Sequence, residues 1–458
     1  MSDRNITTDW TLPPDIEVII IDHFLDHKPT LASCSLVCSR WLPRSRKHLF
    51  RDITIKQTDH LTLPLADFLR IVEHSGAVNP EWGVGAYIKM LSLNGRLADQ
   101  QFNLGTPTAA CTLPVLRALL ARLPHLASLC VTKFLIVDDA PQIPNAGRCH
   151  LPPFEIDELS ISCCSGPTKD VHPLLALICT FSRVGSLCVD RWGKRRPNPP
   201  STFSLAPFSP PVIRSFVLGR GSDKAARRAL YAVLATSPPV TDACLTRLSV
   251  NADEYDDVVM FTTFVDLAGA ALRDVELRVL EPDIRLDLLS GIFLPACTAL
   301  SSLTLSFQCC FNDSFLEDAE DIRDMFGVYT ALLRSHCHVF VGLKTIRLEM
   351  RPIGKNMLVA FRRVAQDTFL QGPDDAVHTV PPPEADQNRA VWGFLEDVLC
   401  DFPALQRVEI VLFETPRPGG ALTEAAKVEL RRALEEKLPR LSRNGTAQLV
   451  FYLCSIRG

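Results

Sequence analysis

The sequence has 458 residues, enough for more than one structural unit. Its formal net charge is −4, with 47% hydrophobic and 22% charged residues, so the composition predicts no general attraction to nucleic acid or to anionic membranes. No apolar run is long enough to span a bilayer, and the first ten residues lack the apolar segment of a secretory signal. We therefore expect a globular protein of the cytosol or nucleus that binds neither nucleic acid nor membrane.

Sixteen cysteines are scattered along the chain, and no C-x-x-C pair occurs. Several of them lie inside apolar runs, where a thiol is expected to be a small buried hydrophobic group that stays free in a reducing compartment. These cysteines are Cys130, Cys179, Cys188, Cys297 and Cys400.

The first predicted elements are three short helices within residues 12–50. Pro13 and Pro14 suit the start of a helix, and four apolar residues then share one helical face. Thr30 is the predicted N-cap of the second helix, and Pro43 lies near the start of the third. The residues of the apolar face are Ile16, Ile19, Ile20 and Phe24.

About forty residues cannot form a stable core alone, so this segment is expected to dock onto something else. The alternative is that these helices are the first piece of a larger domain that buries their apolar faces internally.

The order of the residues resembles an F-box. Leu12-Pro13 precedes the acidic Asp15, apolar positions follow, and Trp41 ends the series; the tail, SLVCSRWLPRSRKHLF, resembles the F-box proteins of mushroom-forming (basidiomycete) fungi in particular. Many F-boxes carry Glu where this chain has Asp15, and the negative charge is kept.

The resemblance implies that residues 9–55 bind a Skp-type adaptor and, through it, a cullin-type ubiquitin ligase. It also implies which residues make or support that contact. They are Leu12, Pro13, Ile16, Ile19, Ile20, Leu31, Cys34, Val37 and Trp41.

A spacing of apolar residues, at positions 1, 4 and 6 of a short segment, recurs through the rest of the chain. The last positions of consecutive copies, residues 131, 161, 189, 218, 250, 277 and 305, are 27 to 32 residues apart. A degenerate last copy includes Val450 and Tyr452. The copies are Ile88/Leu91/Leu93, Leu126/Leu129/Val131, Ile156/Leu159/Ile161, Val184/Leu187/Val189, Ile213/Phe216/Leu218, Leu245/Leu248/Val250, Leu272/Val275/Leu277, Leu300/Leu303/Leu305, Leu343/Ile346/Leu348 and Leu405/Val408/Ile410.

Helix-like segments precede several of these predicted strands, as in residues 116–131, 174–189 and 394–410. A helix plus a strand every 28 to 30 residues buries its apolar faces only when copies stack. The pattern resembles a divergent leucine-rich repeat over residues 88–458, with residues 56–87 as a linker and N-terminal cap. The predicted fold class is α/β: a three-helix F-box, then a leucine-rich-repeat-like solenoid with a parallel concave sheet. The alternative is a non-repetitive α/β domain.

Three stretches interrupt the period and are predicted to be inserted loops: residues 190–211, 312–324 and 351–390.

No phosphate-binding, metalloprotease or nucleophile motif occurs, so we expect no catalysis, no metal and no cofactor. Gly219-Arg220-Gly221 is predicted to be a turn between repeats. The acidic cluster Asp253–Asp257 is predicted to be a solvated loop rather than a cation site. His336-Cys337-His338 resembles a metal-binding triplet, but adjacent ligands rarely close a tetrahedral site.

The variable strand positions change in character along the repeats. They are small in the early copies (Ser92, Cys130, Ser160, Cys188) and charged in the later ones. We expect the later ones to form a substrate-recognition surface on the concave face; the alternative is that they are ordinary solvated positions. The charged positions are Glu276, Arg278, Arg347, Glu349, Arg407 and Glu409.

Together these features predict a non-catalytic substrate receptor of an SCF-like ubiquitin ligase, which binds the adaptor through the F-box and an unknown protein through the repeats. The alternative is an interaction scaffold with no ubiquitin transfer.

Overall fold

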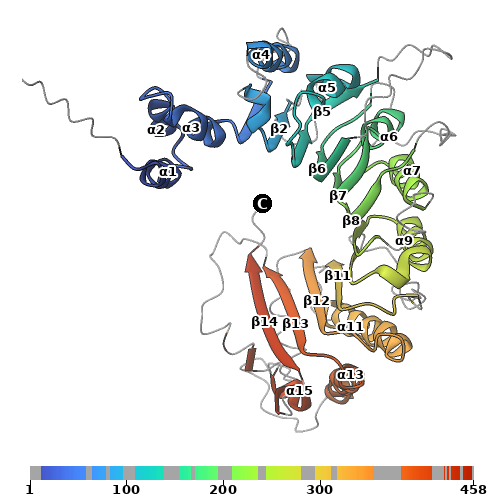
Figure 1. Cartoon of the computed structure of the whole chain (residues 1–458). Helices are drawn as coiled ribbons and strands as arrows, with labels where there is room; N and C mark the ends of the chain where they lie inside the picture. The colour runs from blue at the N-terminus through green and yellow to red at the C-terminus, as the bar shows by residue number, and fades with distance from the viewer. Residues whose placement is uncertain are drawn as a thin grey trace, which may run out of the picture. The chain divides into compact units, whose positions relative to one another are not determined.

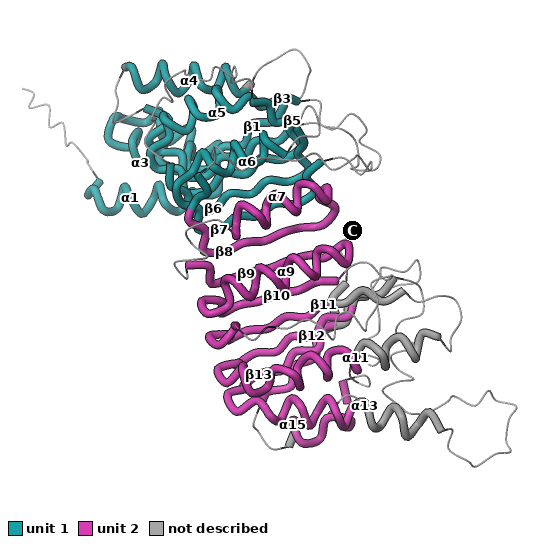
Figure 2. Tube along the Cα trace, turned by 90° about the vertical axis from the view of Figure 1, so that its right-hand side faces the viewer, with its two compact units in different colours: residues 1–211 teal, residues 212–458 magenta. Residues whose placement is uncertain are grey.

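Figure 1 shows the computed structural model of the chain. It divides into two compact units, residues 1–211 (unit 1) and residues 212–458 (unit 2), coloured separately in Figure 2; each is described by itself. The structure describes residues 12–57, 64–78, 83–95, 109–138, 154–166, 171–193, 209–235, 244–279, 294, 296–310, 317–353, 383–414, 428, 431–432, 435–443 and 447–455.

Unit 1 begins with the three predicted helices: α1 (Pro14–His23), α2 (Lys28–Cys34) and α3 (Trp41–Leu49). The second helix begins at Lys28, and the N-cap is His27 rather than Thr30, whose backbone N–H instead donates to the His27 ring. The N-cap prediction was wrong because the imidazole of His27 supplies the acceptor that a Thr hydroxyl was expected to supply.

An ion-pair cluster holds α1 against α3. The Asp22 carboxylate of α1 accepts hydrogen bonds from Arg44 Nε (2.6 Å) and pairs with His48 Nε2 (2.7 Å), both on α3. The hydrogen bonds from Arg44, with a smaller contribution from His48, lower the pKa of Asp22 to about 2 against the cost of burial. The acid is therefore ionised at every physiological pH.

The main sheet of unit 1 is parallel, and its strand order follows the chain. Its strands are β1 (Asp52–Lys56), β2 (Met90–Asn94), β4 (Ser128–Thr132), β6 (Phe154–Ser162) and β7 (Phe181–Asp190). A second parallel pair joins β3 (Ala109–Thr112) to β5 (Phe134–Val137). The connecting helices are α4 (Pro64–Val78), η1 (Val84–Tyr87), α5 (Leu113–Leu120) and α6 (His172–Ile178).

Unit 2 repeats the same arrangement. Its parallel strands, again in chain order, are β8 (Val212–Leu218), β9 (Arg247–Ala252), β10 (Asp274–Val279), β11 (Ser302–Cys310), β12 (Thr345–Ile353), β13 (Arg407–Glu414) and β14 (Gln448–Ser455). The helices lie along one face of these strands (Figure 1), and we call the opposite face the strand face. They are α7 (Lys224–Ala235), α9 (Tyr255–Ala268), η2 (Gly269–Ala271), α11 (Glu317–His336), α13 (Pro383–Cys400) and α15 (Pro439–Arg443).

The recurring apolar positions form the core. All three positions of all ten copies are buried, and the second and third positions of each copy lie on a strand. Equivalent positions are aligned in register, as Leu248, Val275 and Leu303 are across β9, β10 and β11. This confirms the predicted helix–strand repeat. The fold is a mixed α/β fold whose parallel strands are consistent with a leucine-rich-repeat-like solenoid.

The sheet begins earlier than the residue 88 expected from the sequence. β1 pairs in parallel with β2, so the sheet starts at Asp52, and α4 occupies part of the expected linker at residues 56–87. Phe50, Ile53 and Ile55 have the same 1, 4, 6 spacing as the later copies, a signal that the segment's resemblance to the end of an F-box obscured.

The residue after each of three unit 1 strands has a left-handed backbone: Lys133, Cys163 and Arg191, with φ of 62°, 54° and 50°. These turns stack, because the Lys133 N–H donates to the Ser162 carbonyl at the end of the next strand. At the corresponding turn after β2, a Cβ on Gly95 would lie 2.2 Å from the Lys133 carbonyl oxygen, so the stacking leaves room only for glycine.

Two of the predicted inserted loops are partly regular. α11 begins at Glu317, so residues 317–324 of the expected loop 312–324 are helical. β12 extends to Ile353 and α13 begins at Pro383, so both ends of the expected loop 351–390 belong to regular secondary structure. Acidic residues in a first helical turn complement the helix dipole, so an acidic stretch is not by itself a loop signal. Residues 354–382 and 194–208 lie outside the described residues.

Candidate protein-interaction surfaces

Large hydrophobic side chains are exposed on and beside α1 and α2. Their exposed fractions run from 38% to 86%, with Leu36 the most exposed. Ile16 and Ile19 lie at i and i+3 of α1 and so share one face, and Leu12 lies just before the helix. We call these residues the N-terminal apolar patch: Leu12, Ile16, Val18, Ile19, Leu25, Leu36 and Val37.

The patch arises because α1 is apolar on more sides than its neighbours cover. Ile21 is the one buried residue of α1, and Leu31 and Cys34 are the buried residues of α2. Of the face predicted from the sequence, Ile16 and Ile19 are exposed, whereas Ile20 and Phe24 are partly buried. The alternative interpretation, internal burial of the whole face, therefore does not hold for Ile16 and Ile19.

The nine residues predicted for adaptor contact fall into three groups. Ile20 and Trp41 are partly buried, and Leu31 and Cys34 are buried, so the last two support the helices from within. The remaining five, all exposed, are Leu12, Pro13, Ile16, Ile19 and Val37. The prediction missed the exposed Val18, Leu25 and Leu36, which the sequence shows as apolar residues off the expected helix face.

The six charged residues predicted for substrate binding come together on the strand face of unit 2. They lie on β10, β12 and β13, and the intervening β11 positions are small: Thr304 and Ser306. We call the six the charge ladder: Glu276, Arg278, Arg347, Glu349, Arg407 and Glu409.

Arg347 lies at the centre of the charge ladder. Its Nε donates to Glu349 Oε1 over 2.7 Å, and its Nη1 donates to Glu409 Oε2 over 3.0 Å. Arg407 Nε forms an ion pair with Glu409 Oε1 at 2.6 Å, and Arg407 Nη2 donates to the Tyr452 hydroxyl on β14 over 2.5 Å.

The other half of the charge ladder joins β9, β10 and β12. Arg278 forms an ion pair with Glu276 on its own strand, and its Nε lies 3.9 Å from Glu349 Oε2 across β11. The Ser249 hydroxyl on β9 donates to Glu276 Oε2 over 2.7 Å. Opposite charges are therefore paired from β10, across the uncharged positions of β11, to β12 and β13.

The carboxylates of the charge ladder are more buried than the guanidiniums. The Glu349 side chain is 3% exposed, whereas the Arg347 side chain is 34% exposed. Three arginines balance three glutamates, so the charge ladder is neutral. Its side chains bind one another, which neither interpretation of the sequence included, and substrate binding by these residues stays a prediction.

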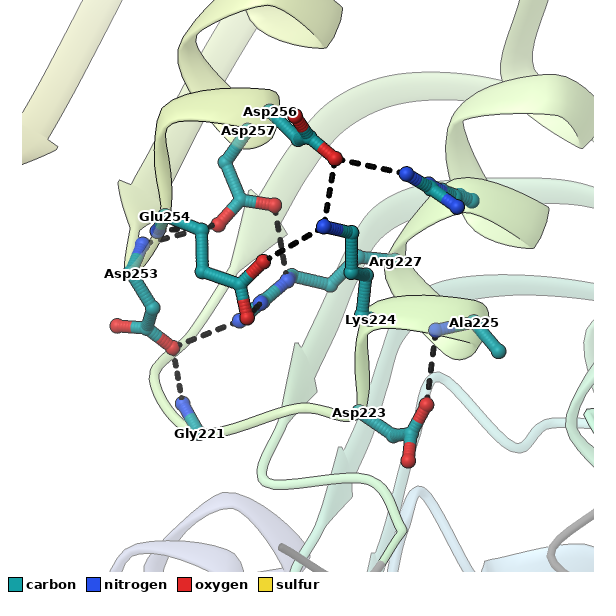
Figure 3. A network of polar contacts seen from close by, with 10 residues as sticks. Gly221, Asp223, Lys224, Ala225, Arg227, Asp253, Glu254, Asp256 and Asp257 are labelled. Carbon is teal, nitrogen blue, oxygen red and sulfur yellow. Dashed lines mark hydrogen bonds and ion pairs between the residues drawn. The ribbon is translucent and has the colours of Figure 1, made fainter. Parts of the chain in front are cut away.

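The acidic cluster Asp253–Asp257 forms the start of α9 rather than a solvated loop (Figure 3). Asp257 is buried, and its Oδ1 lies 2.9 Å from Nε of Arg227, a buried residue of α7. Asp253 Oδ2 pairs with Arg227 Nη1 at 2.8 Å and accepts the Gly221 N–H at 2.7 Å. The loop prediction was wrong because cations of the preceding repeat neutralise these acids.

The same contacts explain the glycine turn at Gly219–Gly221, which joins β8 to α7 as predicted. Gly221 has a φ of 65°, a conformation that glycine adopts at no steric cost.

His336, from the metal-like triplet, has a structural role. Its Nε2 accepts the Leu294 backbone N–H over 2.8 Å, and its Nδ1 donates to the Leu332 carbonyl over 2.7 Å. Burial lowers the pKa of His336, which favours the neutral ring that these two bonds require. Within the described residues, no group of three or more His, Cys, Asp or Glu side chains could hold a metal ion.

Several thiols are too buried to ionise readily. Burial raises the pKa of Cys111, Cys164, Cys179 and Cys297 to about 12. A thiol with such a pKa is protonated at neutral pH and is therefore a poor nucleophile. In the part of the chain that is described, no helix combines the length and apolarity needed to cross a membrane.

A groove of about 440 Å³ lies between α11 and α13 of unit 2. Its lining is mostly apolar and includes Ala331 and Phe394. The Arg334 guanidinium carbon lies 5.7 Å from the centre of the Phe394 ring, within the range of a cation–π contact.

No family model matches the chain, and no curated protein matches it. The solved structures that match include the leucine-rich repeat-containing protein LegL7 from Legionella pneumophila, at 11% sequence identity and a TM-score of 0.32, over 85% of this chain and 98% of that one. So loose a superposition carries no argument. The description of the repeats therefore rests on the strand register and the buried apolar positions of this chain.

Proposed function

We propose that this chain is a substrate receptor of an SCF-like ubiquitin ligase. In this proposal the N-terminal apolar patch binds a Skp-type adaptor and through it a cullin, while the repeats bind a protein substrate. The chain performs no chemistry itself; it raises the effective concentration of the substrate near the catalytic partner.

The observation that carries the proposal is the N-terminal apolar patch. Ile19 and Val37 are 63% and 62% exposed, and Leu36 is 86% exposed, within a unit of three short helices. Contiguous apolar surface on a soluble protein marks an interaction site. Five of the nine residues that the F-box resemblance assigns to the adaptor contact are exposed in this structure.

The order of elements also fits the proposal. The three helices precede a stack of helix–strand repeats, and repeat proteins commonly bind other proteins over their extended surfaces. We place the chain in the cytosol or nucleus, where an adaptor of this kind and free buried thiols are both expected.

The test measures adaptor binding. A chain with Ile19→Asp and Val37→Asp is compared with wild type for binding to a purified Skp-type adaptor, by surface plasmon resonance. Each substitution removes an apolar contact worth about 1 to 2 kcal/mol and adds a charge to the interface, so Kd is expected to rise at least tenfold.

The matched control changes Leu267→Asp and Val341→Asp, which are also exposed apolar residues but lie in unit 2. The control is expected to bind the adaptor as wild type does. If wild type itself fails to bind the adaptor, the receptor proposal is wrong. If it binds but supports no ubiquitin transfer to any captured protein, the chain is an interaction scaffold.

A further inference from the structure

Exposed cations line the edge of unit 2 at which its strands begin. Arg214 and Arg247 lie on β8 and β9, Arg273 immediately precedes β10, and Lys344 immediately precedes β12. All four are exposed. We call these four residues the basic margin.

The backbone fixes the order of the basic margin. The Thr246 N–H donates to the Arg214 carbonyl, and the Arg273 N–H donates to the Thr246 carbonyl. The row of backbone hydrogen bonds continues through Ser301. The Ser301 N–H donates to the Arg273 carbonyl, and the Ser301 carbonyl accepts the Lys344 N–H. Arg214, Arg273 and Lys344 therefore occupy equivalent positions on every second strand.

These cations have no structural partner among the residues that the structure describes. No carboxylate of the described residues lies within ion-pair distance of them, in contrast to the arginines of the charge ladder. One exposed carboxylate, Asp274, lies in register with Arg247 but does not pair with it. Arg214 and Arg247 lie within strands, so the dipole of a helix end does not account for them.

The distance between neighbouring cations of the basic margin indicates which kind of ligand fits them. Neighbouring strands are about 4.8 Å apart, so cations on every second strand are about 9.6 Å apart. A peptide in the polyproline II conformation has three residues per turn and advances about 3.1 Å per residue, so every third side chain lies on the same face about 9.3 Å further on. We propose that the basic margin binds a segment of a partner protein in this extended conformation that carries carboxylates at about every third residue.

Nucleic acid fits this row less well than an acidic peptide. Single-stranded nucleic acid is bound by cations together with aromatic side chains on which bases stack. The residues between the cations are Thr246 and Ser301, whose side chains offer hydroxyl groups and no stacking surface. Hydroxyl groups can instead donate to peptide carbonyls or to carboxylates.

This proposal deepens the proposed function by naming the class of substrate. It rests on the proposed function only in treating the bound partner protein as a substrate. Peptide binding by unit 2 and adaptor binding by the N-terminal apolar patch are measured separately. A basic-margin variant is expected to keep its adaptor affinity, so failure of one idea is distinguishable from failure of the other.

The experiment measures fluorescence anisotropy of a labelled twelve-residue peptide with Glu at every third position, separated by Ser and Gly, against the full chain. The variant is Arg214→Ser, Arg273→Ser and Lys344→Ser. An exposed ion pair changes Kd by a factor of about 1.4 to 5, so loss of three raises Kd by about 3- to 150-fold. Added salt weakens wild-type binding.

The control removes three exposed cations elsewhere, Lys47→Ser, Arg431→Ser and Arg432→Ser, and has the same net charge as the variant. It is expected to bind the peptide within twofold of wild type. The proposal is overturned if the control weakens binding as much as the variant does, if wild type shows no binding at millimolar peptide, or if a peptide with its four Glu residues adjacent binds equally well. Tighter binding of a single-stranded oligonucleotide also overturns it.

Discussion

The buried pair of Arg227 and Asp257 is predicted to hold α7 against α9, and Arg227→Leu tests this. Both side chains are 3% exposed, and the Arg227 guanidinium also pairs with Asp253. Removal of one partner of a buried ion pair leaves an uncompensated charge and costs about 3 to 5 kcal/mol. We expect that cost to appear as opening of α9.

Hydrogen–deuterium exchange of the α9 amides measures the opening directly and does not require the whole chain to unfold in one step. A cost of about 3 to 5 kcal/mol corresponds to exchange about 100- to 5,000-fold faster. Arg228→Leu is the control, because Arg228 is exposed and pairs with the exposed side of Asp256. An exposed pair is worth at most about 1 kcal/mol, so exchange changes by no more than about fivefold.

Asp257→Asn in the Arg227→Leu background is expected to restore most of the protection, because the amide oxygen still accepts the backbone N–H groups of Asp253 and Glu254. Burial raises the pKa of Asp257, and loss of Arg227 raises it further. A carboxyl with a raised folded pKa favours folding at low pH, so the cost of Arg227→Leu falls as pH decreases through that pKa. Protection in Arg227→Leu within threefold of wild type at pH 7 would refute the reasoning.

Three further predictions concern one buried histidine and two glycines. The pKa of His336 is lowered in the folded chain, so its contribution to stability is complete above its ordinary pKa of 6.5 and is lost as pH falls below that value. Amide exchange in α11 is therefore expected to accelerate from pH 7 to pH 5 in wild type. If a chain with His336→Leu keeps this acceleration, the assignment to His336 is contradicted. Gly95→Ala places a Cβ 2.2 Å from the Lys133 carbonyl oxygen and lowers the free energy of unfolding by about 2 kcal/mol or more, measured from urea midpoints. Gly327 lies in α11, and nothing is within 4 Å of a Cβ added there. Gly327→Ala is therefore expected to raise the free energy of unfolding by about 0.5 to 1 kcal/mol in the same assay, and a loss of stability would show that the site is not open.

The repeat could be predicted from sequence because its signal is local. Apolar residues at positions 1, 4 and 6 must be buried wherever the strand lies, and all ten copies are. The start of the sheet was harder to predict. Ile53 and Ile55 have the right spacing, but they follow a segment already assigned to the F-box. Competition between two local patterns on one stretch is settled only by the pairing of β1 with β2.

Polar contacts between repeats could not be predicted in the same way. Arg347 and Glu409 are 62 residues apart and meet only because β12 and β13 are aligned in one particular register. Likewise Arg227 reaches Asp257 only because α7 and α9 pack side by side (Figure 3). Sequence identifies such residues as charged, whereas the register decides whether they pair with one another or remain free.

On α1 the limit of prediction from the sequence was different. The sequence shows the apolar positions, but several faces of the helix are apolar, and the periodicity does not say which one is covered. The structure buries Ile21 and leaves Ile19 exposed. The choice depends on α2 and α3, whose packing against α1 also involves the Asp22–Arg44 pair.

The strand order, which follows the chain in each unit, has a consequence for how the protein folds. Partner residues on neighbouring strands are close in sequence, as Asp274 and Ser302 are on β10 and β11. A low contact order of this kind reduces the loop-closure entropy that precedes each strand pairing, so folding is expected to start within any adjacent pair of repeats and spread to its neighbours. Among the described strands of unit 2, β14 pairs only with β13, so unit 2 is expected to lose structure first at β14 when it unfolds.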